Sequence, residues 1–161
     1  FFDYYFGDTG DEVFVPTLYL LGQNRLPQLL EFMKEPGLYT FARCHVAPAV
    51  ALIARLQPER REEVIEWFRQ VLTFFTENLA DNIYCDGTLA GMLVSDLLGI
   101  RAEELLPEIK AMYTTGLVDR FCCGNYAEVE DEFFSSGFIS GDKYSLDIYE
   151  RYRAYHKRWG D

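Results

Sequence analysis

The residues from Tyr39 to Leu79 limit the possible folds most, because they hold two long apolar patterns separated only by Gln57-Pro58-Glu59. In the second pattern, apolar residues recur every three or four positions, which is the spacing of one helix face and not the alternation of a strand. They are Val64, Ile65, Phe68, Leu72, Phe75 and Leu79. Trp67, Val71 and Phe74 widen this apolar arc, so we expect the helix to lie between two others.

The first pattern, about Thr40 to Leu56, has Pro48 in its middle. Proline has no amide hydrogen to donate to the carbonyl of Cys44, and its ring presses on the preceding turn. We therefore expect this helix to bend or restart near Arg43 to His45. Pro58 stands in the first turn of the following helix, where a missing N–H is tolerated.

Helical spacing and short loops predict helix pairs at 12–35, 40–79 and 82–115. Leu20-Leu21-Gly22 followed by Leu26-Pro27 in the first pair is echoed by Leu97-Leu98-Gly99 followed by Leu106-Pro107 in the third. About two periods of ~35 to 47 residues, the length of a stacked helical repeat, separate the two glycines. The sequence therefore predicts an all-α fold, a short right-handed α-solenoid (a HEAT/ARM-like superhelix) of about three helical hairpins. An irregular all-α bundle is the alternative.

The central and third pairs can be aligned in the same way. Placing Leu56 over Leu98 puts Ala49 over Gly91, so that a small residue matches a small one and a large residue a large one. Gly87 and Gly91 lie within the third pair, where each costs a helix about 1 kcal/mol relative to alanine. We expect another helix to approach them closely.

The C-terminal part departs from the repeat. An acidic helix is predicted at 125–135, where it would cap the open end of the stack. Serine and glycine residues then lead to a final helix, predicted at 145–159, which carries aromatic residues on one side and basic residues on another. Such a helix can bind a membrane surface or a partner's groove, or can fold back onto the acidic body.

Three segments resemble an uncharacterised bacterial family of domains of unknown function with HEAT-like α-helical repeats. They are Tyr19-Leu20-Leu21-Gly22 through Leu26-Pro27-Gln28-Leu29-Leu30, Glu62-Glu63-Val64-Ile65-Glu66-Trp67-Phe68, and Leu105-Leu106-Pro107-Glu108-Ile109 with Gly116-Leu117-Val118-Asp119. The resemblance covers roughly residues 1 to 135 and implies a helical repeat fold without an assigned activity. Longer relatives carry a cysteine-rich zinc-binding motif that this chain does not have, so the resemblance implies no zinc.

Length, hydrophobicity and net charge limit the classes of protein to which this chain can belong. A chain of 161 residues, 49% of them hydrophobic, is sufficient for one domain, taken as 1–161. No apolar run approaches the ~20 residues of a membrane span. The net charge of -11 argues against nucleic acid and favours a basic partner or a simple role in solubility.

The four cysteines have no disulfide framework spacing and indicate reduced thiols in the cytoplasm. Because the chain begins with Phe1 and not with methionine, we expect the natural N-terminus to lie upstream.

The candidate binding residues are Arg43, His45, Tyr84 and Asp86, because the Pro48 break and the repeat alignment bring Arg43 opposite the Cys85-Asp86 region. They predict either a structural Arg43–Asp86 pair between repeats or the polar floor of a groove, in which His45 titrates near neutral pH.

No catalytic residue, metal site or cofactor is predicted. A cysteine adjacent to its histidine in a helix points about 100° away from it, and the two histidines show no paired ligand spacing. The leading hypothesis is a non-enzymatic protein- or peptide-binding module. Alternatives are an enzyme or small-ligand carrier with a polar pocket, and a structural assembly subunit.

Overall fold

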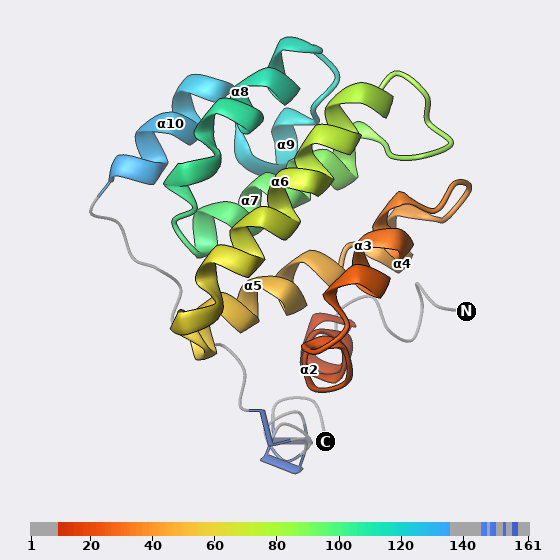
Figure 1. Ribbon diagram of the computed structural model, residues 1–161, viewed down its shortest axis with the longest axis vertical. Coiled ribbons are helices and arrows are strands. Elements are labelled where there is room, and N and C mark those ends of the chain that lie inside the picture. Colours follow the sequence, from red (N-terminus) through yellow and green to blue (C-terminus); the bar gives the residue numbers. More distant parts are fainter. Residues whose placement is uncertain (1–9, 136–145, 148, 151–152, 154–155, 158–161) are drawn as a thin grey trace.

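In the computed structural model of the protein, every regular element of the described residues is helical, which confirms the predicted all-α fold. The structure describes residues 10–135, 146–147, 149–150, 153 and 156–157 (Figure 1). Short 3-10 turns, Pro58–Arg60 and Glu103–Leu105, precede α6 and α8. The α-helices are α2 (Gly10–Gly22), α3 (Leu26–Lys34), α4 (Thr40–Arg43), α5 (Val46–Leu56), α6 (Arg61–Asn78), α7 (Gly87–Gly99), α8 (Leu106–Thr114), α9 (Arg120–Cys123) and α10 (Tyr126–Phe134).

The helices pack in two rows that each follow the chain order. In one row α2 packs on α5, α5 on α7, and α7 on α9; in the other α3 packs on α6, α6 on α8, and α8 on α10. The rows meet where α5 packs on α6, α3 on α5 and α10 on α7 (Figure 1). Gly22 and Gly99 end α2 and α7, and the Leu-Pro pairs at 26–27 and 106–107 begin α3 and α8, as the echoed pattern predicts.

Helix α6 lies at the centre of its row, in contact with α3, α5 and α8, as its wide apolar arc predicts. The six residues of its predicted core face are all buried, and so are Trp67 and Val71. The indole Nε1 of Trp67 donates to the carbonyl of Leu26 at 3.0 Å, which fixes α6 against the start of α3. Periodic apolar residues therefore place α6 correctly from sequence alone.

The predicted break before Pro48 is confirmed. Helix α4 ends at Arg43 and α5 begins at Val46, so Pro48 stands in the first turn of α5, where no helical donor is required. The turn at Cys44 and His45 separates the two helices. Because of this break, the side chains of α4 do not follow the helical period of α5.

Both glycines of α7 are closely approached as predicted, but only Gly91 meets another helix, while Gly87 meets the segment before α9. A Cβ on Gly91 would lie 2.7 Å from the carbonyl oxygen of Asp119 and 2.8 Å from the Cβ of Cys122 in α9. A Cβ on Gly87 would lie 2.1 Å from the carbonyl oxygen of Leu117. The segment 117–122 therefore lies directly against the backbone of α7.

Two features of this region differ from the prediction. Residues 82–86 are not helical, because Asp86 is the N-cap of α7 and the helix begins only at Gly87. The short helix α9, capped by Asp119, had no counterpart in the predicted elements. By contrast, α10 falls within the predicted 125–135, and Asn125 and Glu128 form a capping box at its start. The predicted final helix, 145–159, lies largely outside the described residues.

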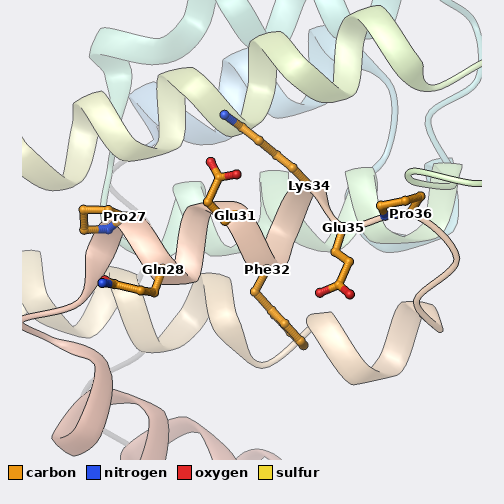
Figure 2. A pocket seen from close by; sticks show the side chains of 7 residues that line it. All are labelled: Pro27, Gln28, Glu31, Phe32, Lys34, Glu35 and Pro36. Carbon is orange, nitrogen blue, oxygen red and sulfur yellow. The ribbon is translucent and has the colours of Figure 1, made fainter.

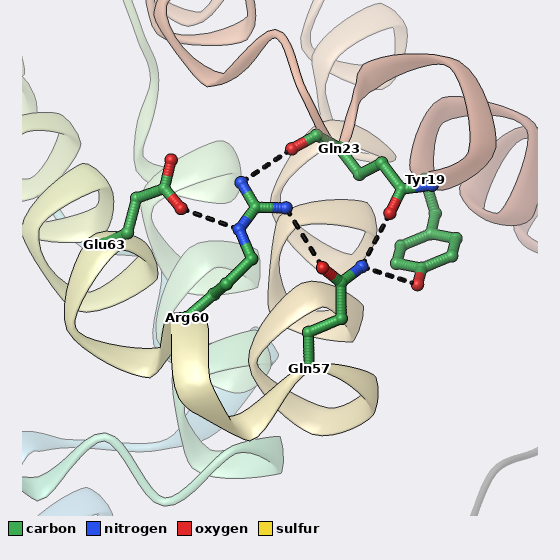
Figure 3. Close-up of polar contacts among 5 residues, drawn as sticks. All are labelled: Tyr19, Gln23, Gln57, Arg60 and Glu63. Atoms are coloured by element: carbon green, nitrogen blue, oxygen red, sulfur yellow. Dashed lines mark hydrogen bonds and ion pairs between the residues drawn. The ribbon is translucent and has the colours of Figure 1, made fainter.

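The turns between helices are tied together by a polar network shown in Figure 3. Gln57 Nε2 donates to the Tyr19 hydroxyl at 2.9 Å and to Gln23 Oε1 at 2.6 Å. Arg60 donates to the backbone carbonyl of Gln23 at 2.8 Å and to Glu63 at 2.7 Å. This network joins the α2–α3 turn to the α5–α6 turn.

Arg61 makes the equivalent connection in the other direction. Its guanidinium donates to both carboxylate oxygens of Glu104 at 3.0 Å, and to the carbonyls of Ile100 at 3.1 Å and Arg101 at 2.9 Å. Those carbonyls follow the end of α7, where helical partners are lacking. Arg60 and Arg61, at the start of α6, therefore bind the α2–α3 turn and the α7–α8 turn respectively.

The Arg61–Glu104 pair predicts a specific loss of stability in acid. Burial raises the pKa of Glu104, but its bonds to Arg61 and to the backbone prevail, and the pKa lies below its ordinary value of 4.5. The folded state therefore gains stability from this carboxylate above about pH 4.5 and loses it as the pH falls lower. We expect Glu104→Gln to lower the free energy of unfolding by about 0.5 kcal/mol at pH 7 and to have a smaller effect at pH 3.

Urea denaturation at both pH values checks this expectation. Glu103→Gln is the matched control, because Glu103 is an exposed neighbour in the same 3-10 turn. A Glu104→Gln effect of equal size at both pH values would contradict the proposed contribution of the ion pair.

None of the described helices combines the length and apolar character needed to cross a membrane.

Candidate functional site

Arg43 is a buried clamp between two loops. Its side chain is only 1% exposed, and its guanidinium donates to the backbone carbonyls of Met33 at 3.1 Å, Leu38 at 3.1 Å and Glu35 at 3.4 Å. It also donates to the carbonyl of Tyr84 in the α6–α7 loop. The carbonyls near the end of α3 lack helical donors, so Arg43 closes this helix end and joins it to the next pair.

Asp86 strengthens the same junction from the other side. Its Oδ1 accepts from the backbone N–H of Leu89 at 2.8 Å and so caps α7, while its Oδ2 accepts from the hydroxyl of Thr40. The N–H of Gly37 donates to the carbonyl of Ile83 at 2.6 Å. The two loops are therefore joined by backbone and side-chain bonds together.

The predicted Arg43–Asp86 pair is replaced by this arrangement. Both residues lie at the junction, but among the described residues Arg43 donates only to carbonyls and Asp86 accepts from Thr40 and Leu89. Burial lowers the pKa of Arg43, and the nearby Cys85 and Asp86 partly oppose this shift. The aromatic ring of Tyr84 meets Phe74 edge-on, with centroids 5.6 Å apart. Arg43, Tyr84 and Asp86 therefore stabilise the contact between the α3–α4 and α6–α7 loops.

His45 lies elsewhere, in a groove across the first row of helices. Its ring stacks on Phe14 of α2 with centroids 5.3 Å apart. The groove has a volume of about 530 Å³ and crosses α2, α4, α5, α7 and α9. It is lined by Val15, Phe41, Cys44, His45, Pro48, Ala51, Leu52, Arg55, Met92, Ser95, Asp96, Gly99, Ile100 and Cys122. Of the four predicted site residues, His45 alone lines this groove.

An apolar pocket of about 400 Å³ adjoins the groove and shares Phe41 and His45 with it. We call it the aromatic pocket; its walls are Phe14, Leu18, Phe32, Tyr39, Phe41, Ala42, His45 and Val46. Tyr39 and Phe41 are 61% and 47% exposed. Phe41 lies in the predicted apolar pattern of Thr40 to Leu56 but is exposed, because α4 is separate from α5. The sequence signal for this pocket is the pair of aromatic residues, Tyr39 and Phe41, that precedes the helix break at Pro48.

A third hollow, of about 720 Å³, follows the outer surface of α3 and is lined by charged residues as well as Phe32. Figure 2 shows Phe32 and Glu35 directed toward α4, and Glu31 and Lys34 directed toward α6. Lys34 Nζ lies 5.8 Å from the centre of the Phe74 ring. Phe32 also lines the aromatic pocket, so the two hollows meet at this residue.

Three of the four thiols are poor nucleophiles. Burial raises the pKa of Cys85 to about 11, and it also raises the pKa values of Cys122, which lines the groove, and of Cys123. Protonated thiols do not attack carbonyl groups at neutral pH. In the part of the chain that the structure describes, no three His, Cys, Asp or Glu side chains are grouped to hold a metal ion.

The buried thiol of Cys85 gives a measurable prediction. Since its side chain is fully buried and its pKa is about 11, we expect iodoacetamide at pH 8 to leave Cys85 unmodified in the folded protein and to modify it in 6 M urea. Mass spectrometry of tryptic peptides measures this, with the partly exposed Cys44 as the internal control. Equal rates at the two sites in the folded protein would contradict the burial of Cys85.

Comparison of the chain with protein-family models, curated proteins and solved structures gives no match. The resemblance to HEAT-like repeat domains therefore stays a prediction. The groove and the aromatic pocket are the candidate binding sites of the protein.

Proposed function

We propose that the protein is a non-enzymatic module that binds a protein or peptide segment in the groove. We further propose that its two rows of helices form a short right-handed α-solenoid of the HEAT/ARM kind, with C-terminal capping helices. The chain order within each row supports this interpretation, because stacked repeats place equivalent helices side by side. A groove that crosses α2, α5, α7 and α9 then crosses successive units.

The observation that carries the proposal is the continuity of the groove with the aromatic pocket through Phe41 and His45. Extended binding surfaces combine a few aromatic anchors with scattered polar groups. The groove offers Arg55, Ser95 and Asp96 along its length, and the pocket offers apolar walls at one end. A peptide longer than a single residue matches this shape better than a compact metabolite.

Charge and chemistry support the same interpretation. The net charge of -11 attracts basic segments and accelerates their encounter with the protein. The raised pKa values of Cys85 and Cys122 disfavour these two thiols as nucleophiles, and Arg43 donates its hydrogen bonds to backbone carbonyls. Binding a basic segment therefore requires only the charge and the side chains that line the groove, and no catalytic group.

Selection of random dodecapeptides by display on the full chain, followed by affinity measurement, tests the proposal. Ser95 is exposed on α7 and lines the groove, so we expect Ser95→Trp to weaken selected peptides at least tenfold. Thr73→Trp is the matched control, because Thr73 is exposed on α6 in the other row. If no peptide is selected, or if both variants bind equally well, the proposal is wrong.

A further inference from the structure

The walls of the aromatic pocket are suited to a cation with an apolar stem. Four aromatic rings line it, those of Phe14, Phe32, Tyr39 and Phe41. The rings of Tyr39 and Phe41 are tilted by 53° with centroids 5.5 Å apart. Ring faces carry negative electrostatic potential and attract ammonium and guanidinium groups within about 6 Å. The protein uses this attraction elsewhere, where Lys110 Nζ lies 5.4 Å from the Tyr126 ring centre.

A carboxylate lies in the hollow along α3, which meets the aromatic pocket at Phe32. This carboxylate belongs to Glu35, which follows α3, is exposed, and points to the same side of α3 as Phe32 (Figure 2). Among the described residues no side chain pairs with the Glu35 carboxylate, while its backbone carbonyl accepts from Arg43. Lys34, the nearest basic residue in sequence, is turned toward Phe74 on α6. The hollow beside the pocket therefore carries a negative charge that a ligand can neutralise.

We propose that the aromatic pocket receives a lysine or arginine side chain of the bound protein segment. The aliphatic stem would pack between the rings, and the cation would lie against the ring faces and reach the Glu35 carboxylate. This inference rests on the proposed function and adds the chemistry of the anchor residue. It agrees in sign with the net charge of -11.

The Glu35 carboxylate favours a basic side chain over a neutral side chain of similar size in the pocket. Norleucine has the stem of lysine without the charge and would bury similar apolar area against Phe14 and Phe41. It would leave the carboxylate without a partner and would gain nothing from the ring faces. A basic side chain is therefore the occupant that uses both the aromatic walls and the carboxylate of the adjoining hollow.

The test uses four small probes and the full chain with carbon-13 in its aromatic rings. The probes are the Nα-acetyl N-methylamides of arginine, citrulline, lysine and norleucine, which pair each cation with an uncharged analogue. We expect arginine and lysine to shift the ring signals of Phe32, Tyr39 and Phe41 saturably, with dissociation constants at least fivefold lower than those of citrulline and norleucine.

Two substitutions locate the effect. Glu35→Gln is expected to reduce the preference for the charged probes, whereas Glu31→Gln is the matched control, because Glu31 points toward α6 (Figure 2). Phe41→Leu keeps the apolar bulk of an exposed residue but removes its ring, and we expect it to weaken the cations more than norleucine.

The inference is overturned if norleucine binds as well as lysine, if Glu31→Gln acts as strongly as Glu35→Gln, or if the shifts lie outside the pocket. Cross-relaxation between Phe41 and the chain's own aromatic residues 1–6 would identify another occupant and would also overturn it. Selected peptides that bind the groove without a shared basic residue would remove this inference and leave the proposed function standing. Charged probes that bind the pocket when no peptide is selected would remove the proposed function and overturn the bound segment as the source of the cation, while the pocket would remain a cation site.

Discussion

Gly87→Ala is expected to lower the free energy of unfolding by about 3 kcal/mol, because overpacking against backbone is among the more costly core changes. A methyl group at this position would lie 2.1 Å from the carbonyl oxygen of Leu117. Backbone yields less than a side chain does, and here it is held by the bond from the N–H of Asp119 to the carbonyl of Gly87 at 2.9 Å. The segment 117–122 must therefore move away from α7.

A glycine on the same helix provides the control. A Cβ on Gly99, at the C-terminal end of α7, meets nothing within 4 Å. We expect Gly99→Ala to leave stability unchanged or to raise it by up to about 0.5 kcal/mol, since alanine restricts the unfolded chain more than glycine does. Gly91→Ala should fall between the two, at a loss of about 2 kcal/mol, because its closest contact, the carbonyl oxygen of Asp119 at 2.7 Å, is less severe than the 2.1 Å contact at Gly87.

Chemical denaturation followed by circular dichroism measures all three variants, and alkylation reports on the cause. If segment 117–122 is displaced, Cys122 becomes more accessible, and its reaction with iodoacetamide should accelerate in Gly87→Ala but not in Gly99→Ala. Equal stability of the two variants would show that the segment does not press on α7 as the structure indicates.

These glycines illustrate what the sequence can predict. Gly87 and Gly91 are unfavourable in a helix unless something approaches closely, so their presence reports a contact. The face of α6 was equally predictable, because a 3.6-residue period can be read over eighteen residues. The break before α5 followed from Pro48. In each case a local rule of backbone or periodicity was sufficient.

Elements without such a rule were missed. Helix α9 has four residues, which is too short for any period. The start of α7 was placed too early because Ile83 and Tyr84 extend its apolar pattern into the loop, whereas the N-cap bond of Asp86 to Leu89 decides where the helix begins. Local patterns therefore gave the helices and left their connections uncertain.

The candidate site shows the same limit. Sequence alignment of the pairs brought Arg43 close to Asp86, and the structure places both at one junction. The bonding partners of Arg43 are backbone carbonyls, which every residue has, so no residue pattern announces them. The aromatic pocket was missed because its walls come from four helices, α2 to α5, and because Phe41 fitted a helical face that the chain does not continue.

Arg43→Met is therefore expected to reduce the free energy of unfolding by about 3 kcal/mol although methionine fits a buried site. The substitution retains most of the apolar stem but leaves the carbonyls of Met33, Leu38 and Tyr84 without the donor they have now. Buried acceptors that lose their partner cost about 1 to 3 kcal/mol together with the loss of packing. The connection between the α3–α4 and α6–α7 loops should weaken with them.

Urea denaturation of Arg43→Met beside Arg25→Met separates this effect from the loss of a positive charge, because Arg25 is exposed just before α3. Arg43→Lys should recover less than half of the lost stability, since an ammonium group cannot reach carbonyls on two loops as a planar guanidinium does. Hydrogen exchange should show faster opening at Gly37, whose N–H bonds the carbonyl of Ile83 across the same junction. If Arg43→Met and Arg25→Met are equally stable and exchange at Gly37 is unchanged, the two loops are held by Asp86 and Thr40 without the arginine.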